Sequence, residues 1–265
     1  DKDATDFDLS EQIQALSRER TDLLKANGYP EDYLKMHYTC PLCQDTGYVN
    51  GQKCHCFRQA EIALLYEQSN LKRMLEKENF DTLSYSFFQG DELTSYRQAV
   101  EKCKNFCTNF KTSYQNLFFY GTVGTGKTFL TNCIAKECIE QGCSVLYFSA
   151  ASLFDLLARN TFDYRAREEL SALCADLYSC DLLVIDDLGT ETATAVTLSH
   201  FFTCLNERLL RQKSVIISTN LSLEDCRNRY QDRIFSRIAS NFEFCKLTGP
   251  DIRMCKKVFA VSGPV

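Results

Sequence analysis

The segment 118–128 constrains the fold most, because it joins an apolar strand to a glycine-rich loop. Its sequence is FFYGTVGTGKT, in which Gly121 and Gly126 bracket the pattern G-x-x-x-x-G-K-T. Glycine accepts the backbone angles and the close approach that let main-chain N–H groups surround phosphate oxygens. Lys127 is then able to reach the β- and γ-phosphates, and the Thr128 hydroxyl to ligate Mg²⁺. With helix-compatible residues behind it, the segment predicts a nucleoside triphosphate site rather than a chance glycine-rich turn.

A second apolar strand, residues 182–185, ends in two adjacent carboxylates, Asp186 and Asp187. Taken alone, this pattern describes a buried strand with acidic residues at its exposed end. Combined with the phosphate loop, it has the form and the position of a Walker B strand. Asp186 is then expected to hold Mg²⁺ together with Thr128, and Asp187 to polarise the attacking water as general base.

From about Asn116 the sequence alternates apolar strands with helices, which is typical of a parallel sheet covered on both faces. The expected strands are residues 117–120, 144–149, 182–186, 214–218 and 244–247. Residues 150–179 are too many for a minimal crossover and are expected to hold two helices, at about 152–159 and 164–178. Ahead of this region, amphipathic helical patterns cover residues 8–27 and 62–75.

Asn220 follows the fourth expected strand, where its side chain is suited to hydrogen-bond the γ-phosphate and a water. Here the order of parts resembles the AAA+ ATPases, with Asn220 in the sensor I position. The resemblance implies an arginine finger from a neighbouring subunit and a sensor II arginine in the lid of the same subunit. Residues 233–238 carry the finger candidates, of which Arg237 is preferred to Arg233, and Arg253 matches sensor II. The competing interpretation is that the arginines form a solvated helix face.

These motifs together predict a catalytic set and a nucleotide-binding set for ATP with Mg²⁺. The catalytic set is Lys127, Asp186, Asp187, Asn220, Arg237 and Arg253. Nucleotide binding is assigned to Gly121, Thr122, Val123, Gly124, Thr125, Gly126, Lys127, Thr128 and Phe129, and Mg²⁺ binding to Thr128 and Asp186.

A cysteine cluster precedes the ATPase motifs, with the sequence CPLC at residues 40–43 and CHC at residues 54–56. The gap between them contains DTG and NG, which predict a short hairpin with tight turns. Four thiolates gathered in this way suit tetrahedral Zn²⁺, and a full thiolate shell leaves no open position for catalysis. The expected ligands are Cys40, Cys43, Cys54 and Cys56, with His55 as the alternative to one of the last pair. Unpaired or redox-active cysteines are the competing interpretation.

Composition favours a cytoplasmic protein that is not bound to a membrane. Most of the 15 cysteines stand singly in apolar segments, which favours buried thiols in a reducing compartment over disulfides. No apolar run approaches the roughly 18 residues of a membrane helix, and the charged first residues do not resemble a secretory signal. The net charge of −5 argues against coating of nucleic acid by bulk electrostatics, although a local basic groove is compatible with it.

The resemblance is closer than the superfamily and points to bacterial helicase loaders of the DnaC/DnaI type. It is carried by DDLGTE at residues 186–191, the helical insert at 152–173, LTGP at 247–250 and the cysteine cluster. It implies an α/β AAA+ P-loop domain at residues 80–265, with a five-stranded parallel sheet and a short lid. A small helical and zinc-binding domain at residues 1–79 would contact the helicase. Subunits would self-assemble with ATP and place a DnaB-type hexameric replicative helicase on single-stranded DNA.

Two other functions fit parts of the sequence. An IstB-like transposition ATPase, which partners a transposase on duplex DNA, has a similar core but lacks this kind of cysteine-rich domain. A metabolic P-loop kinase would need a substrate pocket that no segment nominates. For single-stranded DNA, basic and aromatic residues in the insert are candidate contacts, although the aromatic ones fit an inward-packed helix equally well: Arg159, Phe162, Tyr164, Arg165 and Arg167.

Overall fold

The structure is a computed structural model that describes residues 9–30, 32–36, 38–54, 56–57, 60, 71–159 and 164–255. The chain forms two compact units, Asp1–Cys54 and His55–Val265, and each is described by itself. The expected functional division into residues 1–79 and 80–265 stays a prediction. Among the described residues, no helix is both long enough and apolar enough to cross a bilayer.

The first unit contains a helix and a small hairpin. Helix α1 (Leu9–Ala26) confirms the helix expected over 8–27, whereas the residue before it lies outside the described residues. Strands β1 (Tyr48–Val49) and β2 (Gln52–Lys53) pair antiparallel and form the hairpin expected between the cysteine pairs. Asn50 and Gly51 at its tip both have positive φ, of 52° and 78°. This is the backbone that a tight Asn-Gly hairpin turn requires.

The second unit is built on a five-stranded parallel sheet, and each expected strand is present. Its strands are β3 (Leu117–Gly121), β4 (Val145–Ser149), β5 (Leu182–Leu188), β6 (Ser214–Thr219) and β7 (Glu243–Leu247). Their order across the sheet is β4-β5-β6-β3-β7. Strand β5 continues two residues further than expected, with a register irregularity against β6 between Ile185 and Leu188. Both carboxylates of the Walker B motif therefore lie within the strand.

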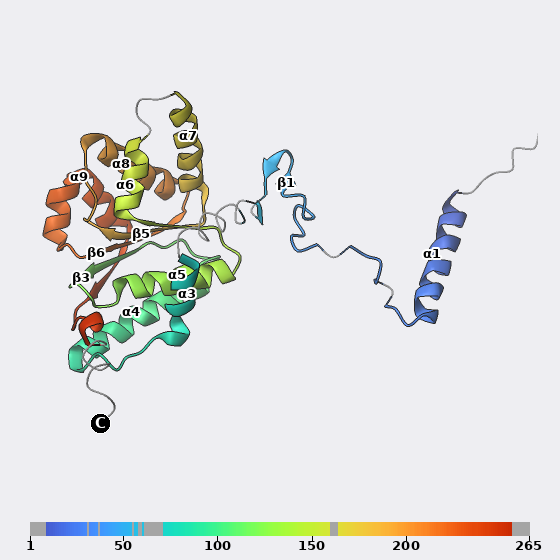
Figure 1. Cartoon of the computed structure of the whole chain (residues 1–265), viewed down its shortest axis with the longest axis horizontal. Coiled ribbons are helices and arrows are strands. Elements are labelled where there is room, and N and C mark those ends of the chain that lie inside the picture. Colours follow the sequence, from blue (N-terminus) through green and yellow to red (C-terminus); the bar gives the residue numbers. More distant parts are fainter. Residues whose placement is uncertain are drawn as a thin grey trace, which may run out of the picture. The chain divides into compact units, whose positions relative to one another are not determined.

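Helices cover both faces of this sheet, as the alternating pattern predicts (Figure 1). One face carries α3 (Leu71–Lys77), α4 (Gly90–Asn109) and α5 (Lys127–Glu140), and the other carries α6 (Ala150–Arg159), α7 (Tyr164–Ser179), α8 (Ala195–Leu210) and α9 (Leu223–Asn241). Neighbouring side chains of β3 illustrate the division, because Phe119 packs with the first group and Phe118 with the second. Both rings are fully buried. The sheet thus separates two apolar cores.

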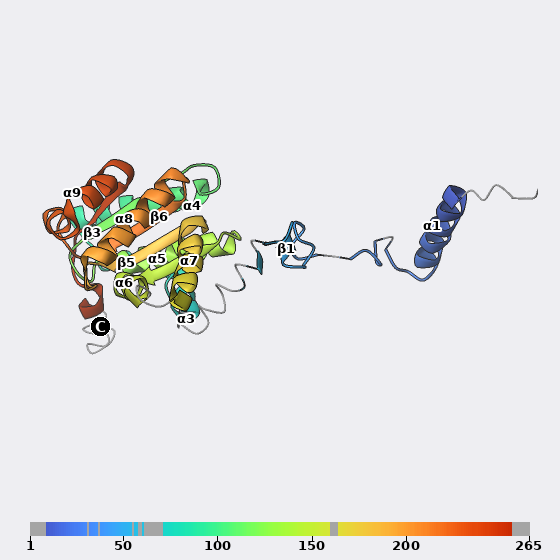
Figure 2. The ribbon, with the colours of Figure 1, turned by 90° about the horizontal axis from the view of Figure 1, so that it is seen from above.

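The segment before the sheet crosses one face of the unit. Helix α3 packs against α5 and is followed by the 3-10 turn η1 (Phe80–Thr82), which Asn79 caps with its side chain. Of the amphipathic pattern expected over residues 62–75, the part before residue 71 lies outside the described residues. The two expected helices between β4 and β5 are present as α6, which packs against β5 and α8, and α7, which packs against α8; both are labelled in Figure 2.

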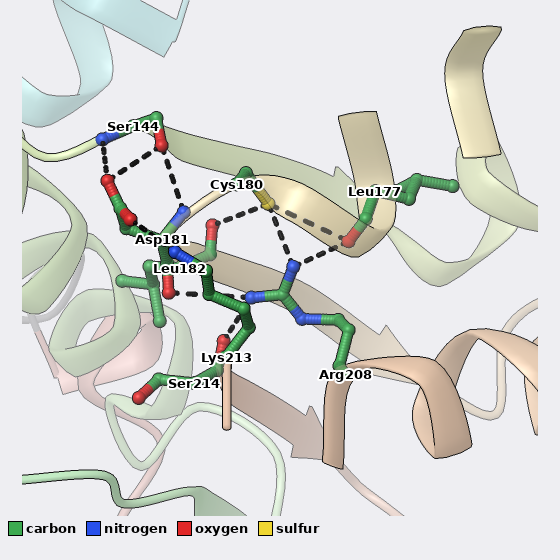
Figure 3. A network of polar contacts seen from close by, with 8 residues as sticks. All are labelled: Ser144, Leu177, Cys180, Asp181, Leu182, Arg208, Lys213 and Ser214. Atoms are coloured by element: carbon green, nitrogen blue, oxygen red, sulfur yellow. Dashed lines mark hydrogen bonds and ion pairs between the residues drawn. The ribbon is translucent and has the colours of Figure 1, made fainter. Parts of the chain in front are cut away.

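A buried arginine joins three elements near the first residues of the central strands β5 and β6 (Figure 3). Arg208 of α8 is fully buried and donates to the carbonyl of Leu177 at 2.5 Å and to that of Ser214 at 2.6 Å. Its guanidinium also lies 3.0 Å from the Cys180 sulfur. Leu177 lies in the last turn of α7, where carbonyls lack helical partners and favour a cation. Arg208 therefore ties α7 and the start of β6 to α8.

Candidate functional site

The phosphate loop connects β3 to α5 and has the backbone that its glycines were expected to provide. Gly124 and Gly126 have φ of 77° and 93°, in the left-handed region that side chains disfavour. Gly121, with φ of 136°, faces the Leu247 carbonyl so closely that a Cβ there has no room. The loop is therefore shaped both by its own glycines and by the last residue of β7.

Lys127 begins α5 and directs its ammonium into the loop. Its Nζ donates to the carbonyls of Gly121 at 3.0 Å and Thr122 at 2.6 Å, and the residue is 4% exposed. Burial lowers the pKa of Lys127 to about 8, although the charges of Asp187 and Asp186 oppose this shift. A bound polyphosphate would stabilise the protonated ammonium of Lys127, so the buried charge favours the binding of a polyanion.

The two Walker B carboxylates differ in their surroundings. Asp186 is buried and accepts hydrogen bonds from the Ser218 hydroxyl and, at 3.2 Å, from the Thr128 hydroxyl. Burial raises the pKa of Asp186, and the neighbouring Asp187 adds to the rise, while the Ser218 bond counteracts it. A divalent cation bound by Asp186 and Thr128 would relieve this unfavourable charge. The donor set is therefore suited to Mg²⁺, which prefers one or two carboxylates with waters and phosphates.

Asp187 has a positive φ of 55°, which is unusual for a residue with a side chain. Its carboxylate accepts from the Asn220 side-chain amide at 3.3 Å. Lys127, Thr128, Asp187, Asn220 and Arg253 all line one cavity. The residues predicted from three separate motifs and from the segment after β7 therefore meet at one site.

Arg253 reaches this cavity because the segment after β7 packs against the phosphate loop. The Ile252 amide donates to the Gly124 carbonyl at 3.0 Å, and a Cβ at Gly124 would overlap Asp251. The Asp251 carboxylate in turn accepts from the Arg253 amide at 2.9 Å. Residues 252–255 are helical, and the rest of the expected lid lies outside the described residues.

Sequence reasoning missed two residues that line the same cavity, Glu78 and Ile252. Glu78 follows α3, and its carboxylate accepts from the buried Asn132 side-chain amide at 2.6 Å. This contact joins residues 54 positions apart. Nothing in the local sequence marks Glu78, because its placement depends on how α3 packs on α5.

The two finger candidates lie outside the described lining of this cavity, on α9. Arg237 donates from Nε to the Asn206 side-chain oxygen at 2.9 Å, and the Arg233 guanidinium lies 5.3 Å from the centre of the Phe202 ring. Both partners belong to α8. The preference for Arg237 as a finger supplied to another subunit stays a prediction.

The four expected cysteines form a compact cluster. Their Sγ atoms all lie within 4.8 Å of one another, and those of Cys40 and Cys54 are 3.8 Å apart. Tetrahedral zinc with Zn–S bonds of about 2.3 Å places its sulfurs about 3.8 Å apart. The cluster also contains Cys43 and Cys56. Its dimensions therefore match a tetrahedral metal site with four thiolates, whereas His55 lies outside the described residues.

The backbone around the cluster is held by local hydrogen bonds. The Asp45 carboxylate accepts from the amides of Thr39 at 3.0 Å and Cys40 at 2.8 Å, and the Cys54 amide donates to the Gly47 carbonyl at 2.7 Å. These bonds fix the turns that carry three of the cysteines. Seven further cysteines were expected as buried apolar side chains. Cys174 is only half-buried, whereas the other six are buried: Cys103, Cys107, Cys133, Cys138, Cys204 and Cys245.

The candidate DNA contacts occupy the junction of α6 and α7. Residues 160–163 lie outside the described residues, as do the side chains of Arg159, Tyr164, Arg165 and Arg167. Their contact with DNA stays a prediction.

The chain is similar in sequence to two curated proteins of DNA replication. The chain is 26% identical to the replicative helicase loader DnaC of Escherichia coli over 147 residues, which are 56% of this chain and 59% of DnaC. It is 28% identical to the chromosomal replication initiator DnaA of Aquifex aeolicus over 192 residues, which are 71% of this chain and 45% of DnaA. The matches therefore span about half the length of these relatives.

Solved structures confirm the AAA+ P-loop fold. A DnaC helicase loader structure superposes with a TM-score of 0.56 at 23% identity, covering 66% of this chain and 99% of that one. A DnaI structure gives 0.53 at 21% identity, covering 66% and 94%. The family model described as IstB-like ATP binding protein matches residues 64–243, which hold the phosphate loop and Walker B strand. The chain belongs to the IstB-like ATP-binding protein family.

Proposed function

We propose that this chain hydrolyses ATP and uses the reaction to load a replicative helicase. The observation that carries the proposal is the meeting of Lys127, Thr128, Asp187, Asn220 and Arg253 around one cavity. Such a set combines a phosphate cradle, a water-orienting carboxylate and amide, and a cation for the γ-phosphate. This is the chemistry of phosphoryl transfer to water.

In this proposal the residues divide the work of hydrolysis. The phosphate-loop amides and Lys127 hold the β- and γ-phosphates, and Thr128 and Asp186 would hold Mg²⁺, which would supply charge neutralisation when bound. Asp187 accepts the proton of the attacking water, which Asn220 orients. The 3.3 Å contact between Asp187 and Asn220 keeps both groups at the same side of the cavity.

We further propose that a neighbouring subunit completes the site. Arg237 would leave Asn206 and approach the γ-phosphate of the adjacent subunit, where an arginine finger raises the rate by about 10³–10⁵. Self-assembly of the ATPase units would then control hydrolysis. Arg253 would stabilise the same phosphate from within the subunit.

The partner we propose is a DnaB-type hexameric replicative helicase, placed on single-stranded DNA in the cytoplasm. The 26% identity to the loader DnaC supports this choice. The cysteine cluster would hold zinc as a structural site that shapes the helicase-binding region, because four thiolates leave no position for substrate. A reducing cytoplasm keeps these thiolates available for the metal.

The alternative is an IstB-like transposition ATPase that acts with a transposase on duplex DNA. The family model that matches residues 64–243 favours it. The two functions share the nucleotide site and differ in the partner that binds.

One experiment separates them. The full chain is mixed with ATP, Mg²⁺ and either a DnaB-type helicase or a transposase, and the mass of any complex is measured, with Lys127→Ala as the nucleotide-binding control. A stable complex of the wild-type chain with the helicase, which Lys127→Ala fails to form, supports the helicase-loader function. A complex with a transposase and none with the helicase would support the alternative. Unchanged ATP turnover in pure Lys127→Ala protein would exclude hydrolysis at this site.

A further inference from the structure

A buried carboxylate lies just beyond the Walker B residues and has no assigned role in hydrolysis. The Glu191 side chain is fully buried, and its oxygens accept from the Gly189 amide at 2.8 Å and from the Tyr230 hydroxyl at 2.5 Å. Arg229 donates from Nε to the same carboxylate at 3.3 Å and from Nη2 to the Glu191 carbonyl at 2.5 Å. A buried charge with this many donors is held rigidly, because losing any of them leaves it poorly compensated.

On one side this cluster fixes the turn that carries Asp187. Glu191 holds the Gly189 amide, while Thr190 donates to the Asp187 carbonyl from its hydroxyl at 2.9 Å and from its amide at 3.2 Å. The Asp187 amide donates to the Ser218 hydroxyl at 3.0 Å. These bonds surround a residue whose φ of 55° costs energy, so the turn keeps Asp187 in a conformation it would otherwise leave.

On the other side the cluster holds the first half of α9. Arg229 and Tyr230 are the last residues before Gln231, where φ of 63° and ψ of 156° break the helix. The second half of α9 then carries Arg233 and Arg237. Burial and the bond to Glu191 raise the pKa of Tyr230, so its hydroxyl remains a donor to the carboxylate. Glu191 therefore binds α9 at the two residues that directly precede its break.

We propose that Glu191 is a positioning residue that links Asp187 in one nucleotide site to the arginine-bearing half of α9. A shift of the Asp187 turn on nucleotide binding is passed through Glu191 to Arg229 and Tyr230, and the break at Gln231 lets the second half of α9 respond. The proposal rests on the proposed function, since the arginines act on a neighbouring subunit. Glu191 would thus couple nucleotide binding in one subunit to the position of the arginines that act on the neighbouring subunit.

Hydrogen exchange of the full chain tests this link. Amide exchange is measured for the phosphate loop and for residues 232–241 with and without a non-hydrolysable ATP analogue and Mg²⁺, in wild type, Glu191→Gln and Tyr230→Phe. Arg227→Ala is the control, because it removes an exposed ion pair to Asp232 on the same helix. If Glu191→Gln fails to fold, Tyr230→Phe, which removes one hydroxyl, carries the test.

We expect the analogue to slow exchange in the phosphate loop of all four proteins. In wild type and Arg227→Ala it should also change exchange in residues 232–241 by about fivefold, the effect of one hydrogen bond, and in the cluster variants this change should disappear. Steady-state turnover of the cluster variants should fall with unchanged affinity for nucleotide, which a general loss of structure would not produce.

Two results would overturn the link while leaving the proposed function intact. One is a protected phosphate loop with no response of α9 in wild type, and the other is an unchanged α9 response in both cluster variants. A phosphate loop that the analogue fails to protect in wild type would instead overturn the proposed function, and this inference with it.

Discussion

Replacing the buried Arg208 by methionine tests what this guanidinium does for the fold. Methionine keeps most of the aliphatic volume but leaves the carbonyls of Leu177 and Ser214 without their donors at 2.5 and 2.6 Å. An unpaired buried carbonyl costs about 1–3 kcal/mol, so two give about 2–6 kcal/mol. Removing a fully buried charge also removes its desolvation penalty, which offsets part of this loss. We therefore expect the free energy of unfolding to fall by about 2–3 kcal/mol.

Urea unfolding followed by far-UV circular dichroism measures this loss, because the chain has no tryptophan to report by fluorescence. With a urea dependence of about 3 kcal/mol per molar, the midpoint should fall by about 0.7–1 M. Arg211→Met, at the C-cap of the same helix, is the matched control, since the exposed pair of Arg211 with Glu207 is worth less than about 1 kcal/mol. A midpoint within about 0.3 M of wild type for the Arg208 variant would refute the carbonyl argument.

Four further outcomes concern Lys127, the cysteine cluster and the finger candidate Arg237. Since the pKa of Lys127 is lowered to about 8, nucleotide binding should take up a proton above that pH, and affinity should fall by up to about tenfold per pH unit toward pH 10. Titration with a fluorescent ATP analogue checks this, and a pH-independent affinity would contradict it. In the unliganded protein the same shift makes stability rise with pH in this window, because the unfolded chain binds more protons. Metal analysis of reduced protein should find about one zinc per chain, lost in Cys43→Ser but retained in Cys174→Ser; wild type without zinc would end that assignment. Arg237→Ala should bind ATP normally but lose the stimulation of turnover by assembly, and equal stimulation in both proteins would show that another arginine acts.

The sequence was most informative where a motif coincides with a whole element. The phosphate loop and the Walker B carboxylates lie between an apolar run and a change of period, so strands β3 and β5 were placed within one or two residues. The cysteine spacing likewise predicted a hairpin whose Asn-Gly turn is present. In each case the interactions that decide the structure are local in the chain.

Long-range packing accounts for what the sequence did not reveal. Glu78 lines the nucleotide cavity because α3 packs on α5, and Arg208 is buried although an arginine in a helix is ordinarily a surface residue. Helix α9 contains no glycine or proline, so its sequence does not predict the break at Gln231. It is maintained by the contacts around it, which include Tyr230 bonded to Glu191.

The fit of Asp251 and Ile252 against Gly124 has a thermodynamic consequence. Because the Gly124 carbonyl accepts from the Ile252 amide and Asp251 fills the space that a side chain at Gly124 would need, the nucleotide and the segment after β7 contact the same loop. If nucleotide binding strengthens or weakens the packing of this segment by some factor, then a partner that displaces the segment must change nucleotide affinity by the same factor. A protein that binds residues 251–252 would thereby change the nucleotide occupancy of this chain.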